Sequence, residues 1–78
     1  MHYVYVLKSY KDNNLYIGCT SNIERRVSEH GAGMVRSTKS RRPLALIYKE
    51  GYSDRYEAFK QERFYKTAEG KRELKGKI

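Results

Sequence analysis

The alternation of apolar and polar positions predicts two strands at the start of the chain. Residues 3–7 form a β-branched and aromatic run, and residues 15–17 form a shorter one. The polar residues 11–14 separate these runs, which is typical of a strand, a turn and a returning strand. Gly18 ends the second run, where a side chain would be unwelcome because of a bulge or the close approach of a ligand.

A helix is predicted next, over about residues 22–30. Ser21 and Glu24 have the spacing of a capping box, apolar residues then recur at helical intervals, and Gly31 provides a stop. Residues 31–43 contain two glycines, a proline, serines and cations, which predicts a mobile basic loop. Residues 44–48 are apolar enough to form a strand at the centre of a sheet.

The last predicted helix opens at Asp54, with Glu57 in a second capping-box position, and ends between residues 66 and 70. Its apolar positions share one face: Ala58, Phe59 and Tyr65. Residues 71–78 alternate charges with little apolar content, which fits either a final helical turn or a frayed tail.

These elements predict one α+β domain spanning residues 1–78, with its core in about residues 3–66. The order β-β-α-β-α, with or without a final helix, favours a small three-stranded antiparallel or mixed sheet flanked by helices. No repeat or linker divides the 78 residues.

The charge of the chain adds a first indication of function. Seventeen Lys and Arg against nine Asp and Glu give a formal net charge of +8, which is most easily explained if a polyanion binds. The segment 36–42 holds four cations and no acid, so it could follow a phosphate backbone. Simple solubility, anionic membranes and acidic proteins are the alternatives.

Cys19 is the only cysteine, so neither an intrachain disulfide nor a cysteine zinc cluster can form. A reducing compartment fits best, and no apolar run is long enough to span a bilayer. The sequence therefore predicts a cytoplasmic protein without a membrane partner.

Glu62 is the first candidate for chemistry, because it lies amid the apolar stripe of the last helix. A partly buried carboxylate needs a compensating cation. That cation is either Lys66, at the favourable spacing of four residues, or a bound Mg²⁺.

Arg26 and His30 are also four residues apart and share a helix face. A guanidinium that grips phosphate and an imidazole that titrates near neutrality suit phosphodiester chemistry. The alternative is a solvated edge on which Arg25 and Arg26 alternate with Glu24 and Glu29.

Taken together, these residues resemble the GIY-YIG nuclease superfamily, and most closely its short single-domain bacterial members related to the nuclease domain of the excinuclease. The resemblance covers residues 3–66. It rests on an ordered set: Tyr3-Val4-Tyr5, Tyr16-Ile17-Gly18, Arg26, His30 and Glu62.

The resemblance implies a metal-dependent endonuclease acting on nucleic acid, DNA in preference to RNA. Glu62 would ligate one Mg²⁺ or Mn²⁺, Arg26 would neutralise charge on the phosphoryl oxygens, and Tyr5, Tyr16 or a relay through His30 would deprotonate the attacking water. The residues expected to contact nucleic acid are Arg25, Arg36, Lys39, Arg41, Arg42 and Lys66.

Three departures from the family pattern keep other functions open. Tyr3 stands where the first tripeptide has its glycine, Cys19 stands where some members have a lysine, and residues 71–78 lack the asparagine found in others. The alternatives are a catalytically inactive nucleic-acid-binding module and an adaptor whose protein partner supplies specificity.

Overall fold

A computed structural model describes all residues, 1–78, and confirms the predicted α+β class. The elements follow in the order β1 (His2–Ser9), β2 (Leu15–Thr20), α1 (Ile23–Gly31), β3 (Leu44–Tyr52), α2 (Arg55–Tyr65) and α3 (Ala68–Lys75), with a short 3₁₀ turn, η1 (Lys39–Arg41), before β3. None of the helices combines the length and the apolar character needed to cross a membrane.

The sheet is antiparallel throughout, in the order β2-β1-β3. The expectation that the third strand lies at the centre is wrong, because β1 pairs with both other strands. Val4 to Leu7 are buried, whereas Leu46 and Ile47 of β3 remain more than a third exposed. Burial on both faces of a strand produces an unbroken apolar run in the sequence, and β1 shares that pattern with β3.

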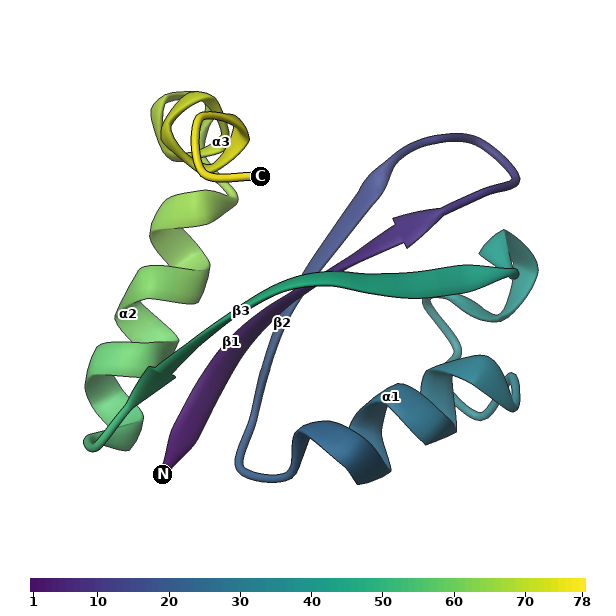
Figure 1. Cartoon of the computed structure of the whole chain (residues 1–78), viewed down its shortest axis with the longest axis horizontal. Coiled ribbons are helices and arrows are strands. Elements are labelled where there is room, and N and C mark those ends of the chain that lie inside the picture. The colour runs from purple at the N-terminus through teal and green to yellow at the C-terminus, as the bar shows by residue number, and fades with distance from the viewer.

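The helices cover opposite faces of the sheet, as Figure 1 shows with α1 on one side of the strands and α2 and α3 on the other. Side chains alternate between faces along a strand. Val4 and Val6 therefore pack with α2 and α3, while Tyr5 projects towards α1. The two faces divide the molecule into a structural half and a half that carries the candidate site.

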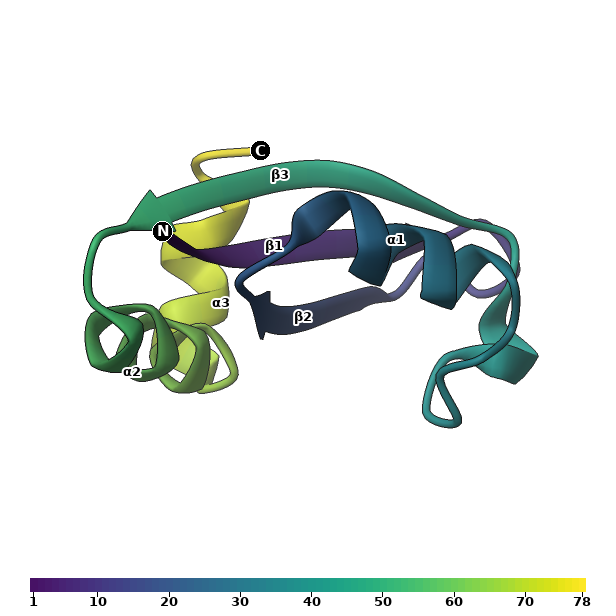
Figure 2. The ribbon, with the colours of Figure 1, turned by 90° about the horizontal axis from the view of Figure 1, so that it is seen from below.

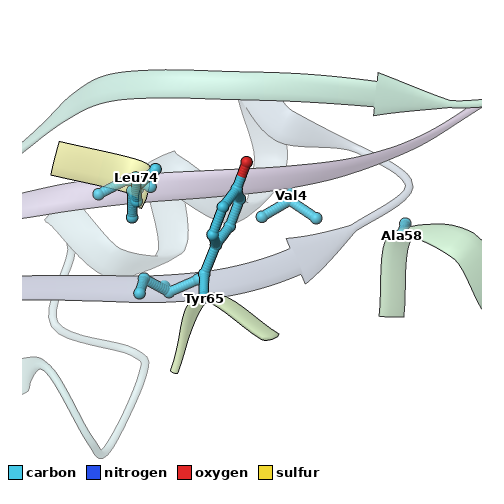
Figure 3. Packing of buried hydrophobic residues seen from close by; sticks show 6 residues of the cluster. Val4, Ala58, Tyr65 and Leu74 are labelled. Carbon is cyan, nitrogen blue, oxygen red and sulfur yellow. The ribbon is translucent and has the colours of Figure 1, made fainter. Parts of the chain in front are cut away.

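The main core lies between the sheet and the helix pair α2 and α3. Figure 3 shows the Tyr65 ring between Val4 and Leu74, with its hydroxyl pointing towards β3. Leu74 is fully buried, so residues 71–78 are not a frayed tail: most of them form α3, and Leu74 anchors it. Phe59 does not lie on the buried face of α2 as the sequence predicts, since its side chain is 50% exposed.

The helix starts correct one prediction and confirm another. The N-cap of α1 is Asn22, whose side chain accepts a hydrogen bond from the Arg25 amide at 3.1 Å, so the predicted cap at Ser21 is one residue early. Asp54 caps α2 as predicted. Both residues are short acceptors in extended backbone, which is the requirement for a cap.

The loop between α1 and β3 is more ordered than the sequence predicts. Val35 and Thr38 are buried within it, and the Ser9 hydroxyl donates to the Arg41 carbonyl at 2.6 Å. Breaker residues indicate where helices and strands stop, but they do not indicate which loop side chains turn inwards.

A carboxylate with four donors joins β3 to α2 and to the segment that follows α3. Glu50 accepts hydrogen bonds from the hydroxyls of Tyr48, Tyr52 and Tyr65 at 2.6, 2.9 and 2.8 Å, and from the Lys77 ammonium at 3.1 Å. We call these five residues the Glu50 cluster. Burial raises the pKa of Glu50, but the four donors outweigh it and hold the pKa below its usual value.

The Glu50 cluster makes stability depend on acid pH. Because the folded-state pKa of Glu50 is depressed, its contribution is present above the unfolded pKa and is lost as pH falls through the folded pKa. We expect Glu50→Gln to lower the free energy of unfolding at pH 7 by about 2 kcal/mol. Urea denaturation at pH 7 and pH 3 should show a smaller gap between variant and wild type at pH 3; an equal gap would contradict the assignment.

Candidate active site

A buried chain of hydrogen bonds connects β1, α1 and the loop before η1. The Tyr5 hydroxyl lies 2.9 Å from Nε2 of His30, and Nδ1 of the same ring lies 2.7 Å from the Thr38 hydroxyl. Tyr5 is 1% exposed, and His30 and Thr38 are fully buried. The imidazole therefore has both nitrogens satisfied inside the protein and no direct access to solvent.

Gly18 creates the space in which the Tyr5 ring lies. The two residues are paired on neighbouring strands, so their side-chain positions share a face. A Cβ added at Gly18 would overlap the Tyr5 hydroxyl and lie 2.9 Å from Cε1 of the ring. The expected bulge or ligand approach is thus not the reason for this glycine, because the protein's own phenol occupies the space.

We expect Gly18→Ala to displace Tyr5 and to destabilise the fold by roughly 1–3 kcal/mol, the usual cost of overpacking. Gly31→Ala is the matched control, because a Cβ there meets nothing within 4 Å. Thermal unfolding of both variants measures the difference. Equal stability of the two variants would show that the ring moves aside without cost.

Two more accessible groups flank the buried chain. The Tyr16 ring lies 5.0 Å from the His30 ring and 6.4 Å from the Tyr5 ring, measured between centroids. The Arg26 side chain is 37% exposed and pairs with Glu29 at 3.1 Å. Figure 2 shows α1, which carries Arg26 and His30, lying over the sheet. The structure therefore brings four of the five predicted catalytic residues together.

The environment keeps both Tyr5 and His30 neutral. Burial raises the pKa of Tyr5, while the Arg26 guanidinium beside its hydroxyl only partly offsets this. Burial and the charge of Arg26 lower the pKa of His30, against a smaller opposing effect of Glu29. His30 is therefore not poised to titrate at neutral pH, contrary to the expectation for an ordinary histidine.

Glu62 reaches the site from the other face of the sheet. Its side chain is 13% exposed and pairs with the Lys66 ammonium at 2.7 Å, as one of the two sequence interpretations predicted. It lines a hollow of the surface with Cys19, Thr20 and Phe59 of the neighbouring elements. Its charge raises the pKa of Tyr5 slightly, but it makes no hydrogen bond to the other four residues.

The predicted nucleic-acid contacts divide into engaged and exposed cations. Arg25 pairs weakly with Glu29 at 3.8 Å, and Arg41 pairs with Asp12 at 3.4 Å. Arg42 is exposed, yet its Nε donates to the Lys39 carbonyl at 3.0 Å. The side chains of Arg36 and Lys39 are exposed and form no ion pair, which leaves them the most available of the set.

A divalent ion would depend on a single protein ligand here. No group of three His, Cys, Asp or Glu side chains is arranged to hold a metal. Glu62 already faces one cation, the Lys66 ammonium, so its surroundings accommodate positive charge. One carboxylate completed by water and phosphate oxygens is a normal arrangement for Mg²⁺, and the donor set fits such an ion.

Thr38 is the site residue that sequence reasoning missed. It lies in the segment predicted to be a mobile basic loop, between exposed cations, and threonine there carries no distinguishing pattern. Only the fold reveals that its hydroxyl faces His30.

Comparison with known proteins agrees with this geometry. Residues 1–75 match the sequence profile described as the GIY-YIG catalytic domain. The chain is 45% identical to the UPF0213 protein SH2523 of Staphylococcus haemolyticus over 95% of this chain and 90% of that protein, and 40% identical to SSP2268 of Staphylococcus saprophyticus with the same coverage. The solution NMR structure of the UPF0213 protein BH0048 from Bacillus halodurans is 31% identical, with a TM-score of 0.59 over 96% of this chain and 82% of that one.

Proposed function

The chain belongs to the GIY-YIG family of nuclease domains, and from this membership we propose that it is a metal-dependent endonuclease that hydrolyses phosphodiester bonds in DNA. The observation that carries the proposal is the grouping of Tyr5, Tyr16, Arg26 and His30 around one buried hydrogen-bond chain. Family membership alone supports a nuclease; this grouping supports the assignment of roles.

Arg26 is suited to hold the scissile phosphate. Its guanidinium is partly exposed, sits next to the Tyr5 hydroxyl, and has only one ion-pair partner, Glu29. A guanidinium offers paired N–H donors that match phosphate oxygens, and it neutralises charge that develops on them during attack. The exposed cations Arg36 and Lys39 would extend this contact along the phosphate backbone.

Glu62 would hold the divalent ion, Mg²⁺ or Mn²⁺. When bound, such an ion supplies polarisation of the phosphate and stabilisation of the leaving 3′ oxygen. Lys66 would have to release the Glu62 carboxylate for that purpose, since its ammonium lies 2.7 Å away.

Tyr5 and Tyr16 are the candidates for handling the proton of the attacking water. Tyr5 is a neutral phenol with a raised pKa, so it works as a relay rather than as a standing phenolate. It can accept a proton from water only while it passes its own proton to His30, the one base within hydrogen-bond reach. Tyr16 is more accessible and would orient the water or the phosphate.

A second function, nucleic-acid binding without cleavage, is favoured by the Glu62–Lys66 pair. In that case the short ion pair is a permanent structural contact, and the cations serve only to hold a polyanion.

A cleavage screen distinguishes the two functions. Purified protein is incubated with duplex, branched and single-stranded DNA and with RNA, in Mg²⁺ or Mn²⁺, and with EDTA as the metal-free control. We expect metal-dependent products with DNA, and loss of cleavage in Arg26→Ala but not in Arg25→Ala, its more exposed neighbour. Binding in a gel shift without any cleavage would support the second function instead.

A further inference from the structure

We propose that Thr38 is a positioning residue that holds the proton of neutral His30 on Nδ1, so that Nε2 is free to receive a proton from Tyr5. The tautomer follows from contacts within the fold, whereas its use in catalysis rests on the proposed function.

Thr38 and Tyr5 are the only groups that satisfy the His30 ring. The distances are 2.7 Å from Nδ1 to the Thr38 hydroxyl and 2.9 Å from Nε2 to the Tyr5 hydroxyl. All three side chains are enclosed, so water does not provide alternative partners. A neutral imidazole donates from one nitrogen and accepts at the other, so the two contacts must have opposite directions.

Arg26 determines which direction applies. A guanidinium only donates, and that of Arg26 faces the Tyr5 hydroxyl oxygen. The phenol proton must then turn away from the guanidinium, and Nε2 is its acceptor on that side. If Nε2 donated instead, the Tyr5 oxygen would receive two donors and its own proton, next to a cation, would lack an acceptor. The favoured chain therefore runs from Tyr5 O–H to Nε2 and from Nδ1–H to the Thr38 oxygen.

This polarity gives Thr38 a role during hydrolysis. As the water oxygen bonds to phosphorus, its proton moves to the Tyr5 oxygen and the Tyr5 proton moves to Nε2. His30 becomes a cation, while its Nδ1–H stays donated to Thr38. The charged groups facing the ring are Arg26, which opposes that cation, and Glu29, which favours it. The Thr38 oxygen is the acceptor that stabilises the transient cation and keeps the ring from rotating.

The tautomer can be measured without any substrate. In ¹⁵N-labelled wild-type protein near pH 7, long-range ¹H–¹⁵N correlation spectra should show His30 protonated at Nδ1, with the partly exposed His2 as a reference. Thr38→Val should shift the population towards the Nε2–H form, Thr38→Ser should restore the wild-type pattern, and Ser37→Ala, an exposed neighbour, should leave it unchanged. A wild-type His30 protonated at Nε2 would overturn the proposal.

Cleavage kinetics test the catalytic part. We expect Thr38→Val to lower kcat about 100-fold with little change in KM, because His30 does not touch substrate; Thr38→Ser should keep most of kcat. Unchanged kcat in a folded Thr38→Val would overturn the role of Thr38. If wild type cleaves nothing, the proposed function fails, while the spectra still decide the tautomer. If Thr38→Val does not fold, the wild-type spectrum and Thr38→Ser decide both parts.

Discussion

Replacement of Glu62 by glutamine is expected to slow DNA cleavage by about a thousandfold, the scale seen when a key electrostatic group is removed from an active site. Glutamine keeps the shape of the side chain but loses the negative charge that would hold the divalent ion. Binding to DNA should persist, since the cations of α1 and of the loop are unchanged. Initial rates over a range of Mg²⁺ concentrations, beside a gel shift, measure both effects.

Two controls separate a metal ligand from a structural ion pair. Glu57→Gln removes an exposed carboxylate from the same helix and should cleave like wild type. Lys66→Met breaks the 2.7 Å pair while leaving the Glu62 carboxylate in place. If Glu62 serves only that pair, Lys66→Met and Glu62→Gln will lose activity and stability to the same extent; Lys66→Met as active as wild type at high Mg²⁺ fits the metal role.

Gly70→Ala is expected to have the largest effect on stability, a loss of roughly 3 kcal/mol or more. Gly70 is buried in the first turn of α3, and its amide donates to the Thr67 cap at 3.0 Å. A Cβ there would overlap the carbonyl oxygen of Phe64 and lie 2.9 Å from Cα of Tyr65, at the end of α2. Backbone cannot rotate away as a flexible side chain can, so α2 and α3 would have to separate and Leu74 would lose its place in the core.

Urea denaturation of Gly70→Ala and Gly76→Ala tests this contact. Gly76 follows α3, and a Cβ there would come no closer than 3.3 Å to the Glu73 carbonyl, so a small change is expected. A Gly70→Ala protein with the wild-type midpoint would mean that the two helices approach less closely than described.

The order of the elements could be predicted from sequence because each carries a local signal. The hairpin has its polar turn, α2 has the Asp54 cap, and β3 has its apolar run. The position of β3 at the edge could not be predicted, since strand order depends on which neighbours pair, not on strand composition. The last helix is hard to recognise because one leucine, Leu74, anchors it among charged residues that give no apolar pattern.

The candidate site was predictable to the extent that residue spacing encodes it. Tyr5, Tyr16, Arg26 and His30 could be selected from the family's ordered set, and the fold groups them. The burial of Tyr5 and His30, and hence their shifted pKa values, depends on packing between elements far apart in the chain. Thr38 and the approach of Glu62 from the opposite face of the sheet required three dimensions.

The contact between Tyr5 and Gly18 links the correct pairing of the hairpin to the assembly of the site. The phenol has room only because the residue opposite it lacks a side chain. A slip of one residue would turn every side chain of β2 to the other face and place Ile17 or Cys19 opposite the ring. A misaligned hairpin therefore cannot form the hydrogen bond to His30, so a molecule with an intact site has necessarily paired its first two strands in the native alignment.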